Sequence, residues 1–410
     1  MLELGMTPEV RELRERVRAF MDEHVYPAEP VFEREDDEAE ALLKRLQGEV
    51  KAAGMWAPFI GPEAGGSGRG FLPYVFLNEV IGRSHWAPRV FGCQAPDTGN
   101  AEIIHLFGTP EQQQRWLRPL VAGDMRSYFA MTEPEVSGAD PTGLRTSAVR
   151  DGDHWVIDGH KWFSSAAEGA AFAIVMAVTD PQAPPHRRTS QIIVPADTPG
   201  LRLLRAIPVL GHRGRGWNTH CEVRLEGVRV PLANTIGEPG DGFRIAQKRL
   251  GPGRIHHVMR WLGQMQRAFE LLCSYALSRE AFGGPLADKQ TVQTWIADSA
   301  AEIQACRLLT LDAAAKIDAG DEARVEVSAI KFHAARVLHD VIDRAVQVHG
   351  ARGLTDETPL ARMYLQARAA RIYDGPDEVH RMVVSRRVLK AFREGTVWDF
   401  AEGGPRPASR

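Results

Sequence analysis

Cysteine is scarce in this sequence and absent from the arrangements that bind zinc or form redox pairs. The 410 residues include four cysteines, with no CxxC pair and no histidine at zinc-ligand spacing. They are Cys93, Cys221, Cys273 and Cys306. Such a distribution is typical of free thiols in a reducing compartment and argues against a structural zinc site.

Long apolar runs and an excess of one charge are also missing. No 18 consecutive apolar residues occur, the first residues lack the features of a secretion signal, and the final PASR is no retention or peroxisomal signal. The net charge is −3, so the whole chain carries no field that favours nucleic acid or an anionic membrane. We therefore expect a cytoplasmic protein with neither a membrane span nor a nucleic-acid surface.

Several catalytic motifs are absent as well. The loops GGSGRG and GHRGRGWN contain neither GxxxxGK[ST] nor a GxGxxG between a strand and a helix, and no GxSxG or HExxH occurs. The adjacent His256 and His257 would point about 100° apart on a helix, which does not suit a shared metal ion. These absences count against phosphate-loop, metal-dependent and hydrolytic functions.

The hydropathy pattern changes twice along the chain, which predicts a multidomain α+β protein. Residues 1–125 show helical spacing interrupted by a Gly/Pro loop at 61–70, and we expect an N-terminal α-helical domain. Residues 126–237 carry strand and turn signals, which predict a middle β domain. Residues 238–395 return to helical spacing and predict a C-terminal helical bundle, and residues 396–410 are expected to be a disordered tail.

The longest helices and the clearest strands are visible in the spacing of apolar residues. Apolar residues recur every three or four positions over 258–276 and again over 330–348, and each stripe predicts one long helix. An Asp-Gly pair at 151–152 separates two alternating segments and predicts a hairpin. The apolar run FAIVMAV that follows is typical of a buried strand.

Four separated stretches together resemble the acyl-CoA dehydrogenase family, and RIYDGPDEVH closes the set. The four are FAMTEPEVSGAD (129–140), GHKWFSS (159–165), SREAFGGPLADKQ (278–290) and QVHGARG (347–353). Their order, with the α, β, α framework, matches the family over nearly the whole chain. The segments RLGPGRIHH and YDGPDEVH are further similar to the branch that in animals is fused to a phosphotransferase-like domain.

The resemblance implies an acyl-CoA dehydrogenase-like fold with an N-terminal helical domain, a middle β-barrel-like domain and a C-terminal four-helix bundle. It implies non-covalent FAD between the middle and C-terminal domains. It also implies a homodimer or homotetramer whose partner subunit completes the FAD site. An acyl-CoA would be the substrate, and an electron-transferring flavoprotein would accept the electrons.

The first two stretches carry expected flavin contacts. Phe129, Met131 and Thr132 match the family pattern directly. Phe163 stands where the family usually has Trp against the flavin, and Ser165 stands where it has Thr beside N5. A flavin ring needs a flat apolar surface and hydrogen-bond donors, which these segments can offer from strand ends.

The next two stretches carry expected contacts to the rest of FAD. Arg279 matches the arginine that reaches the pyrophosphate of the neighbouring subunit's FAD, where a planar two-pronged donor suits phosphate oxygens. Phe282 and Gln290 match adenosine-side contacts. In QVHGARG, an alanine replaces one glycine of the family's QxxGGxG, and glycines there let the backbone approach phosphate. The residues carried over from this pattern are Gln347, Gly350 and Gly353.

Two residues are expected to contact the substrate. The segment TEPEVSGAD is one residue longer than the family's TEPGAGSD, and Ser137 is the candidate for its substrate-contacting serine. Arg254 matches a residue near the pantetheine arm, and we expect its surroundings to be cationic and to meet CoA or an extra anionic group on the acyl chain. The residues that would make them cationic are Arg249, His256, His257 and Arg260. The alternative is a solvated helix face.

Asp374 is the expected catalytic base. Dehydrogenation of an acyl thioester needs a carboxylate within reach of the α-proton and donors at the thioester oxygen. In the family this base is most often the Glu of YEG, and here YDG places an Asp that is shorter by about 1.5 Å. Some relatives place the base on the helix around 253, where this sequence has Gly253. Without the resemblance, an Asp before Gly-Pro would indicate helix punctuation.

The expected reaction gives trans-2-enoyl-CoA, with the α-proton passing to Asp374 and the β-hydride to flavin N5. One alternative is a flavin oxidase of the same fold, acting on acyl-CoA or on nitroalkanes, where the base is an Asp. Another is a non-catalytic flavin-binding protein. The residues leave these alternatives open.

Overall fold

The computed structural model describes residues 5–400 and 403–407, and they divide into two compact units. The first unit is formed by the described residues of segments 1–29, 70–88 and 254–410, and the second by 30–69 and 89–253. Along the chain, helices come first, a sheet follows, and helices return, which confirms the predicted fold class.

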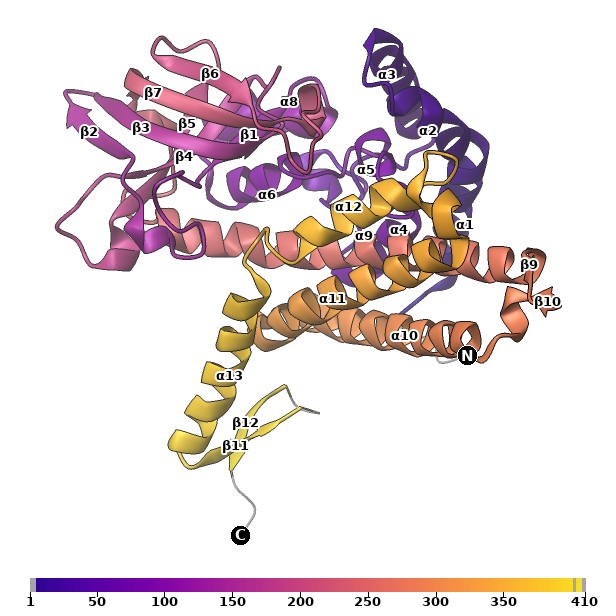
Figure 1. The fold of residues 1–410 in the computed structure, drawn as a ribbon. Coiled ribbons are helices and arrows are strands. Elements are labelled where there is room, and N and C mark those ends of the chain that lie inside the picture. The colour runs from indigo at the N-terminus through magenta and orange to yellow at the C-terminus, as the bar shows by residue number, and fades with distance from the viewer. Residues whose placement is uncertain (1–4, 401–402, 408–410) are drawn as a thin grey trace. The chain divides into compact units, whose positions relative to one another are not determined.

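The first unit consists mainly of helices (Figure 1). Its elements are α1 (Pro8–Phe20), the π-helical turn Met21–Val25, α4 (Phe71–Ile81), the part of α9 (Gly242–Ser278) from Arg254 onward, α10 (Gln290–Asp318), α11 (Arg324–His349), α12 (Leu360–Ala370) and α13 (Asp377–Arg393). Within it, α10 and α11 pack side by side, and α11 also packs against α12 and α13.

The predicted helical stripes are confirmed as buried faces. The stripe over 258–276 lies on α9 and the stripe over 330–348 on α11. Val258, Leu262 and Met265 are completely buried, as are Ala334 and Val337. Because most of each stripe is removed from water, burial of apolar area is what holds these helices together.

The second unit is built around an eight-stranded sheet (Figure 1). Its strands are β1 (Ser127–Ala130), β2 (Ser147–Asp151), β3 (His154–Ser165), β4 (Phe172–Val178), β5 (Thr189–Pro195), β6 (Leu201–Ala206), β7 (His220–Pro231) and β8 (Thr235–Ile236). The order is β6-β7-β3-β2-β4-β5-β8, and β1 pairs in parallel with β4. The unit's helical elements include α3 (Asp37–Ala52), α6 (Asp97–Phe107), α7 (Pro110–Gln112), the π-helical turn Gln113–Leu117, α8 (Arg118–Ala122) and the part of α9 up to Gly253. The chain passes from one unit to the other within α2 (Tyr26–Phe32), α5 (Ala87–Val90) and α9.

Strand β4 is buried on both faces, which explains its unbroken apolar sequence. Ala173 and Val175 belong to one core with residues of β3 and β7, whereas Phe172 and Ile174 belong to another with side chains of α6 and α8. The predicted hairpin is also present, because Asp151 pairs with His154 across the Asp-Gly turn. The sheet is therefore a central layer with apolar packing on either side.

Some features of the fold were not predicted. Strand β6 is an edge strand whose residues are mostly exposed, so its sequence lacks the usual alternation. Within the segment expected to be a disordered tail, β11 (Thr396–Asp399) and β12 (Gly404–Pro407) form an antiparallel pair, while residues 401–402 and 408–410 lie outside the described residues. The division into three domains at 125, 237 and 395 stays a prediction.

In the part of the chain that the structure describes, no helix is both long enough and apolar enough to cross a bilayer. Cys221, Cys273 and Cys306 are free thiols.

Candidate active site

Asp374 lies in the tight turn between α12 and α13. It adopts a positive φ of 54°, and the following Gly375 has a φ of 101°. Asp is one of the few residues that tolerates this region, and glycine adopts it at little cost. Pro376 then caps α13 in an extended conformation. The sequence Asp-Gly-Pro thus separates α12 from α13.

Three helices hold the backbone of this turn. The carbonyl of Asp374 accepts hydrogen bonds from Nε of Arg254 at 2.8 Å and from Nε2 of His380 at 3.1 Å. Lys331, which is completely buried on α11, donates from Nζ to the carbonyls of Ala370 at 2.7 Å and Gly375 at 3.4 Å. The turn is therefore fixed from α9, α11 and α13 at once.

The carboxylate of Asp374 faces a histidine and remains accessible. Its Oδ2 lies 3.1 Å from Nε2 of His257, and the two side chains are 24% and 18% exposed. The neighbouring Asp377 is different, because it is buried and accepts from Nε of Arg371 at 2.8 Å. The third carboxylate of the motif, Glu378, lies in the first turn of α13 and is exposed. Asp374 is therefore the carboxylate of the turn itself that a ligand could reach.

Burial dominates the electrostatics around Asp374. Desolvation lowers the pKa of Lys331 to about 8 and the pKa of His380 to about 4. Burial also lowers the pKa of His257, although the hydrogen bond to Asp374 acts in the opposite direction. Both histidines are therefore neutral near pH 7, and the fixed positive charges that act on Asp374 are Arg254 and Lys331.

The expected cationic cluster around Arg254 is thus only partly realised. His256 stacks on Phe71 and lies edge-on to Tyr74, and burial lowers its pKa well below the usual range. Arg249 belongs to the second unit, where its Nε donates to Asn100 at 3.0 Å. As expected for adjacent helical residues, the two histidines point in different directions; His256 packs against two aromatic rings and His257 faces Asp374, so they do not form one cationic cluster.

The residues expected to contact the outer part of FAD occupy two neighbouring helix ends of the first unit. Arg279 follows α9 and leads into the small hairpin of β9 (Glu280–Ala281) and β10 (Gly284–Pro285), where Phe282 is 99% exposed; Gln290 begins α10. Gln347 lies in the last turn of α11, and Gly350 and Gly353 lie in the 3₁₀ turn after it. These two ends meet because Tyr275 stacks on His349, with ring centroids 4.2 Å apart.

The second unit brings its predicted residues together at the ends of β1 and β3. The carbonyl of Thr132 accepts from the Trp162 N–H at 3.0 Å, and that of Met131 accepts from Nζ of Lys161 at 2.9 Å. Phe163 has a positive φ of 49° and is 42% exposed. The ring of Phe129 lies under the guanidinium of Arg249, 4.1 Å from its carbon.

Two predicted polar residues of this unit have local partners. The Ser165 hydroxyl lies 2.8 Å from Nδ1 of His220. Ser137 is exposed, and its hydroxyl accepts a hydrogen bond from the Ala139 N–H at 3.3 Å. The loop lies close to Thr132, since a Cβ added at Gly138 would be 3.2 Å from the Thr132 side chain. A contact of Ser137 with substrate stays a prediction.

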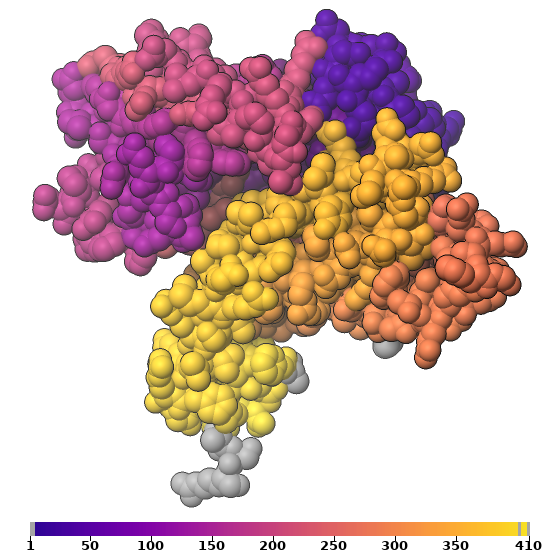
Figure 2. All heavy atoms as spheres, in the orientation of Figure 1, coloured from indigo at the N-terminus to yellow at the C-terminus, as the bar shows by residue number. Residues whose placement is uncertain are grey.

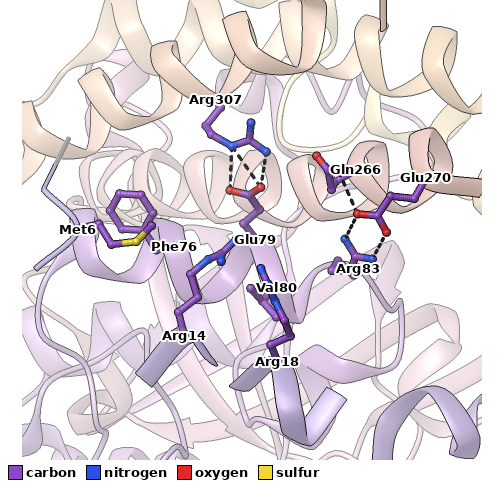
Figure 3. Close-up of a pocket in the computed structure, with 10 residues that line it drawn as sticks. All are labelled: Met6, Arg14, Arg18, Phe76, Glu79, Val80, Arg83, Gln266, Glu270 and Arg307. Atoms are coloured by element: carbon purple, nitrogen blue, oxygen red, sulfur yellow. Dashed lines mark hydrogen bonds and ion pairs between the residues drawn. The ribbon is translucent and has the colours of Figure 1, made fainter. Parts of the chain in front are cut away.

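A separate pocket of about 270 Å³ lies within the first unit among α1, α4, α9 and α10 (Figure 3). Arg307 donates from Nε to both carboxylate oxygens of Glu79, at 3.2 and 3.1 Å, and Arg83 donates to both oxygens of Glu270, at 3.0 and 2.5 Å (Figure 3). The first pair links α4 to α10, and the second links the turn after α4 to α9. None of the predicted site residues lines this pocket.

Comparison with known proteins identifies the family. The chain matches the N-terminal, middle and C-terminal domains of acyl-CoA dehydrogenases over residues 7–124, 128–228 and 240–389. It is 45% identical over 400 residues to FadE2 of Mycobacterium tuberculosis, named as an acyl-CoA dehydrogenase, which covers 95% of this chain and 97% of that protein. The chain belongs to the acyl-CoA dehydrogenase family.

The branch suggested by the sequence is also confirmed. Acyl-CoA dehydrogenase family member 11 of Rattus norvegicus is 42% identical over 394 residues, which make up 93% of this chain. The chain spans about half the length of that relative, because the match covers 50% of it. A solved structure from Mycobacterium abscessus, assigned to the acyl-CoA dehydrogenases, is 41% identical with a TM-score of 0.89, covering 94% of this chain and 99% of that one.

Sequence reasoning assigned no role to Lys331 or His380, although Lys331 contacts the segment RIYDGPDEVH and His380 is its last residue. Lys331 follows Ile330 within the apolar stripe of α11 and could have been noticed as a lysine beside a buried face. His380 sits six residues after Asp374, one turn into α13. Because His380 comes four residues after Pro376, the two residues lie on the same face of α13, and this spacing could have indicated that His380 lies near the turn.

Proposed function

We propose that this chain oxidises an acyl-CoA thioester to the trans-2-enoyl-CoA, with Asp374 as the base that removes the α-proton. The observation that carries the proposal is the Asp374 carboxylate, accessible and held 3.1 Å from His257 in a turn that three helices fix. Membership of the acyl-CoA dehydrogenase family supports the substrate class.

In this proposal the residues around Asp374 prepare the carboxylate for proton transfer. The α-hydrogen of a thioester is acidic only when the enolate-like charge is stabilised, so base and donors must be placed before substrate arrives. Arg254 and Lys331 contribute positive charge beside the carboxylate, and they stay fixed because both are bonded to backbone carbonyls of the turn. Asp374 takes the α-proton and becomes a carboxylic acid.

FAD is the proposed cofactor, and the residues present fit it. Phe163 offers an exposed aromatic face at the end of β3, beside the backbone of Thr132, and such a face suits a flat ring. When bound, FAD would accept the hydride from the β-carbon. The residues proposed to hold it are Phe129, Met131, Thr132, Phe163 and Ser165 in the second unit and Arg279, Phe282, Gln290, Gln347, Gly350 and Gly353 in the first.

A homodimer or homotetramer is proposed as the working assembly. The almost fully exposed Phe282 beside Arg279 is unusual for a large apolar side chain and suits a surface that a second copy covers. Leu389 and Phe392 of α13 are also exposed, and this C-terminal part of the chain is yellow in Figure 2. An electron-transferring flavoprotein is the proposed electron acceptor.

The test is an anaerobic titration of the purified flavoprotein with a panel of acyl-CoAs while the flavin absorbance is followed. We expect at least one acyl-CoA to bleach the flavin of the wild type. Asp374→Asn should keep its flavin and bleach at least about 1,000-fold more slowly, because an amide cannot take the proton. If no acyl-CoA bleaches the wild type, the proposal is wrong. Rapid reoxidation of the reduced flavin by oxygen would instead identify an oxidase.

A further inference from the structure

His257 contacts the carboxylate of Asp374 in a geometry that permits one arrangement of protons. Its Nε2 lies 3.1 Å from Oδ2 of Asp374, and its Nδ1 lies 2.9 Å from Nη2 of Arg260. A guanidinium can only donate hydrogen bonds, so Nδ1 must be the acceptor. The single proton of a neutral imidazole therefore lies on Nε2, where it is donated to Asp374.

The surroundings keep this imidazole neutral. A second proton on Nδ1 would face the N–H of Arg260, and both would be donors with no acceptor between them. The charged and titratable groups that face the Asp374–His257 pair are Arg254 and Arg260 from α9, Lys331 from α11, His380 from α13 and Tyr373 from the turn before α13. Burial raises the pKa of Tyr373, so its phenol is neutral like His380. The other three are cations, which oppose further protonation of His257.

The two residues that set this arrangement sit on a helix that cannot shift easily. A Cβ at Gly82 would lie 2.3 Å from the Cα of Arg260, and one at Gly263 would lie 2.1 Å from the carbonyl oxygen of Glu79. These glycines let α9 lie directly against the end of α4, so Arg260 is locked in place. The ring of His257 also packs on Tyr373, with centroids 4.7 Å apart.

We propose that His257 is a positioning residue, which fixes the rotation of the Asp374 carboxylate by donating from Nε2 to Oδ2 while Arg260 holds the tautomer. This inference rests on the proposed function. In the proton-transfer step the α C–H bond breaks and an O–H bond forms on Asp374. His257 keeps its own proton throughout, so it orients the base and neither gains nor loses a proton.

The test compares His257→Leu with His257→Gln in the anaerobic flavin-reduction assay. Leu removes the donor, whereas the Gln side-chain amide can place an N–H close to the position of Nε2. We expect His257→Leu to slow flavin reduction about 10- to 100-fold, the range for losing a hydrogen bond to a charged group, with KM little changed. His257→Gln should recover much of that rate.

The pH profile separates positioning from a merely structural role. A hydrogen bond to the ionised carboxylate favours that form, so its removal should move the acid limb of the reduction rate to higher pH in His257→Leu. His339→Gln, on α11, is the matched control and should leave the rate and profile unchanged. All variants should keep their flavin content and melting temperature.

Two results would overturn the inference and are distinct from failure of the proposed function. A His257→Leu protein that reduces flavin at the wild-type rate with the wild-type pH profile shows that Asp374 needs no such partner. A Gln variant as slow as the Leu variant shows that the imidazole acts by something other than its N–H. If the wild type itself is never bleached, the proposed function has failed instead.

Discussion

Asp374 combines a short side chain with a backbone conformation that few residues adopt. Asp374 has a positive φ, and its backbone carbonyl accepts hydrogen bonds from Arg254 and His380. These bonds hold the backbone in this conformation. Because the backbone is fixed, the reach of the side chain alone sets where the carboxylate oxygens lie. With this backbone fixed, Asp and the Glu that is more frequent in the family would place their carboxylates at different positions.

Asp374→Glu should therefore impair the reaction even though it restores the commoner residue. The added methylene moves the carboxylate by about 1.5 Å and breaks the contact with His257. We expect flavin reduction to slow by roughly 100-fold, as for other displacements of this size, with flavin content and melting temperature unchanged. Stopped-flow absorbance provides the measurement. A variant as fast as the wild type would show that the turn is not rigid.

At the scale of elements, a buried ion pair ties the end of β1 to β3 and β4. Lys161 is completely buried and donates from Nζ to Glu133 at 2.9 Å and to the carbonyls of Met131 and Met176 at 2.9 and 2.8 Å. Glu133 also accepts from the N–H groups of Arg145 and Thr146. Interactions with Lys161 and these donors hold the pKa of Glu133 below its usual value, against desolvation.

Glu133→Gln should destabilise the second unit. An amide has one acceptor oxygen where the carboxylate serves three donors, so one donor is left facing an NH₂ group while Lys161 loses its counter-charge. Removing one partner of a buried pair costs about 3 to 5 kcal/mol. Denaturant unfolding followed by circular dichroism measures the change. Glu135→Gln, an exposed neighbour 3.5 Å from Arg145, should cost less than about 1 kcal/mol. Equal effects for the two variants would contradict this account.

Helices and strands with a regular pattern of buried residues could be predicted from the sequence, whereas features without such a pattern were missed. The stripes of α9 and α11 and the alternation of β2 and β3 follow from one buried face, and β4 follows from two. Strand β6 was missed because an exposed edge imposes no pattern. Lys331 was missed because its Nζ donates to the carbonyls of Ala370, at the end of α12, and of Gly375, in the turn after it, and only folding brings these carbonyls near.

For the whole molecule, the buried histidines link stability to pH. Desolvation, followed by the charges of Arg254 and Lys331, lowers the pKa of His380 to about 4, against 6.5 for the unperturbed group. Between these values the unfolded chain binds a proton that the folded chain excludes. Stability is therefore lost as the pH falls from about 6.5 toward about 4. Burial raises the pKa of Glu102 to about 8, which acts in the opposite direction.

Replacing His380 should flatten this dependence. In His380→Gln the amide can still donate to the carbonyl of Asp374, but no group titrates there. We expect the melting temperature of the variant to fall less steeply than that of the wild type between pH 6.5 and 4. Above pH 7 the two curves should run parallel. Thermal melts over this range provide the measurement, and equal slopes would show that His380 is protonated without cost.

The position of the proposed base in a turn could be predicted from the sequence, but its surroundings could not. The motif YDGP places a carboxylate at a turn, and adjacent histidines on a helix must diverge, so one partner near Asp374 was foreseeable. Which histidine turns toward Asp374, and in which tautomer, depends on Arg260 one turn further along α9 and on glycines that bring α4 close. These contacts result from the packing of the folded chain and produce no periodic pattern in the sequence.

The most direct measurement is the anaerobic rate of flavin bleaching by an acyl-CoA and by the same acyl-CoA deuterated at the α-carbon. For the wild type we expect the deuterated substrate to react several-fold more slowly, because the bond to the α-hydrogen breaks as Asp374 accepts it. Asp374→Asn should bind FAD yet bleach at least about 1,000-fold more slowly. An Asp374→Asn protein that bleaches at the wild-type rate would contradict the assignment of Asp374 as the base.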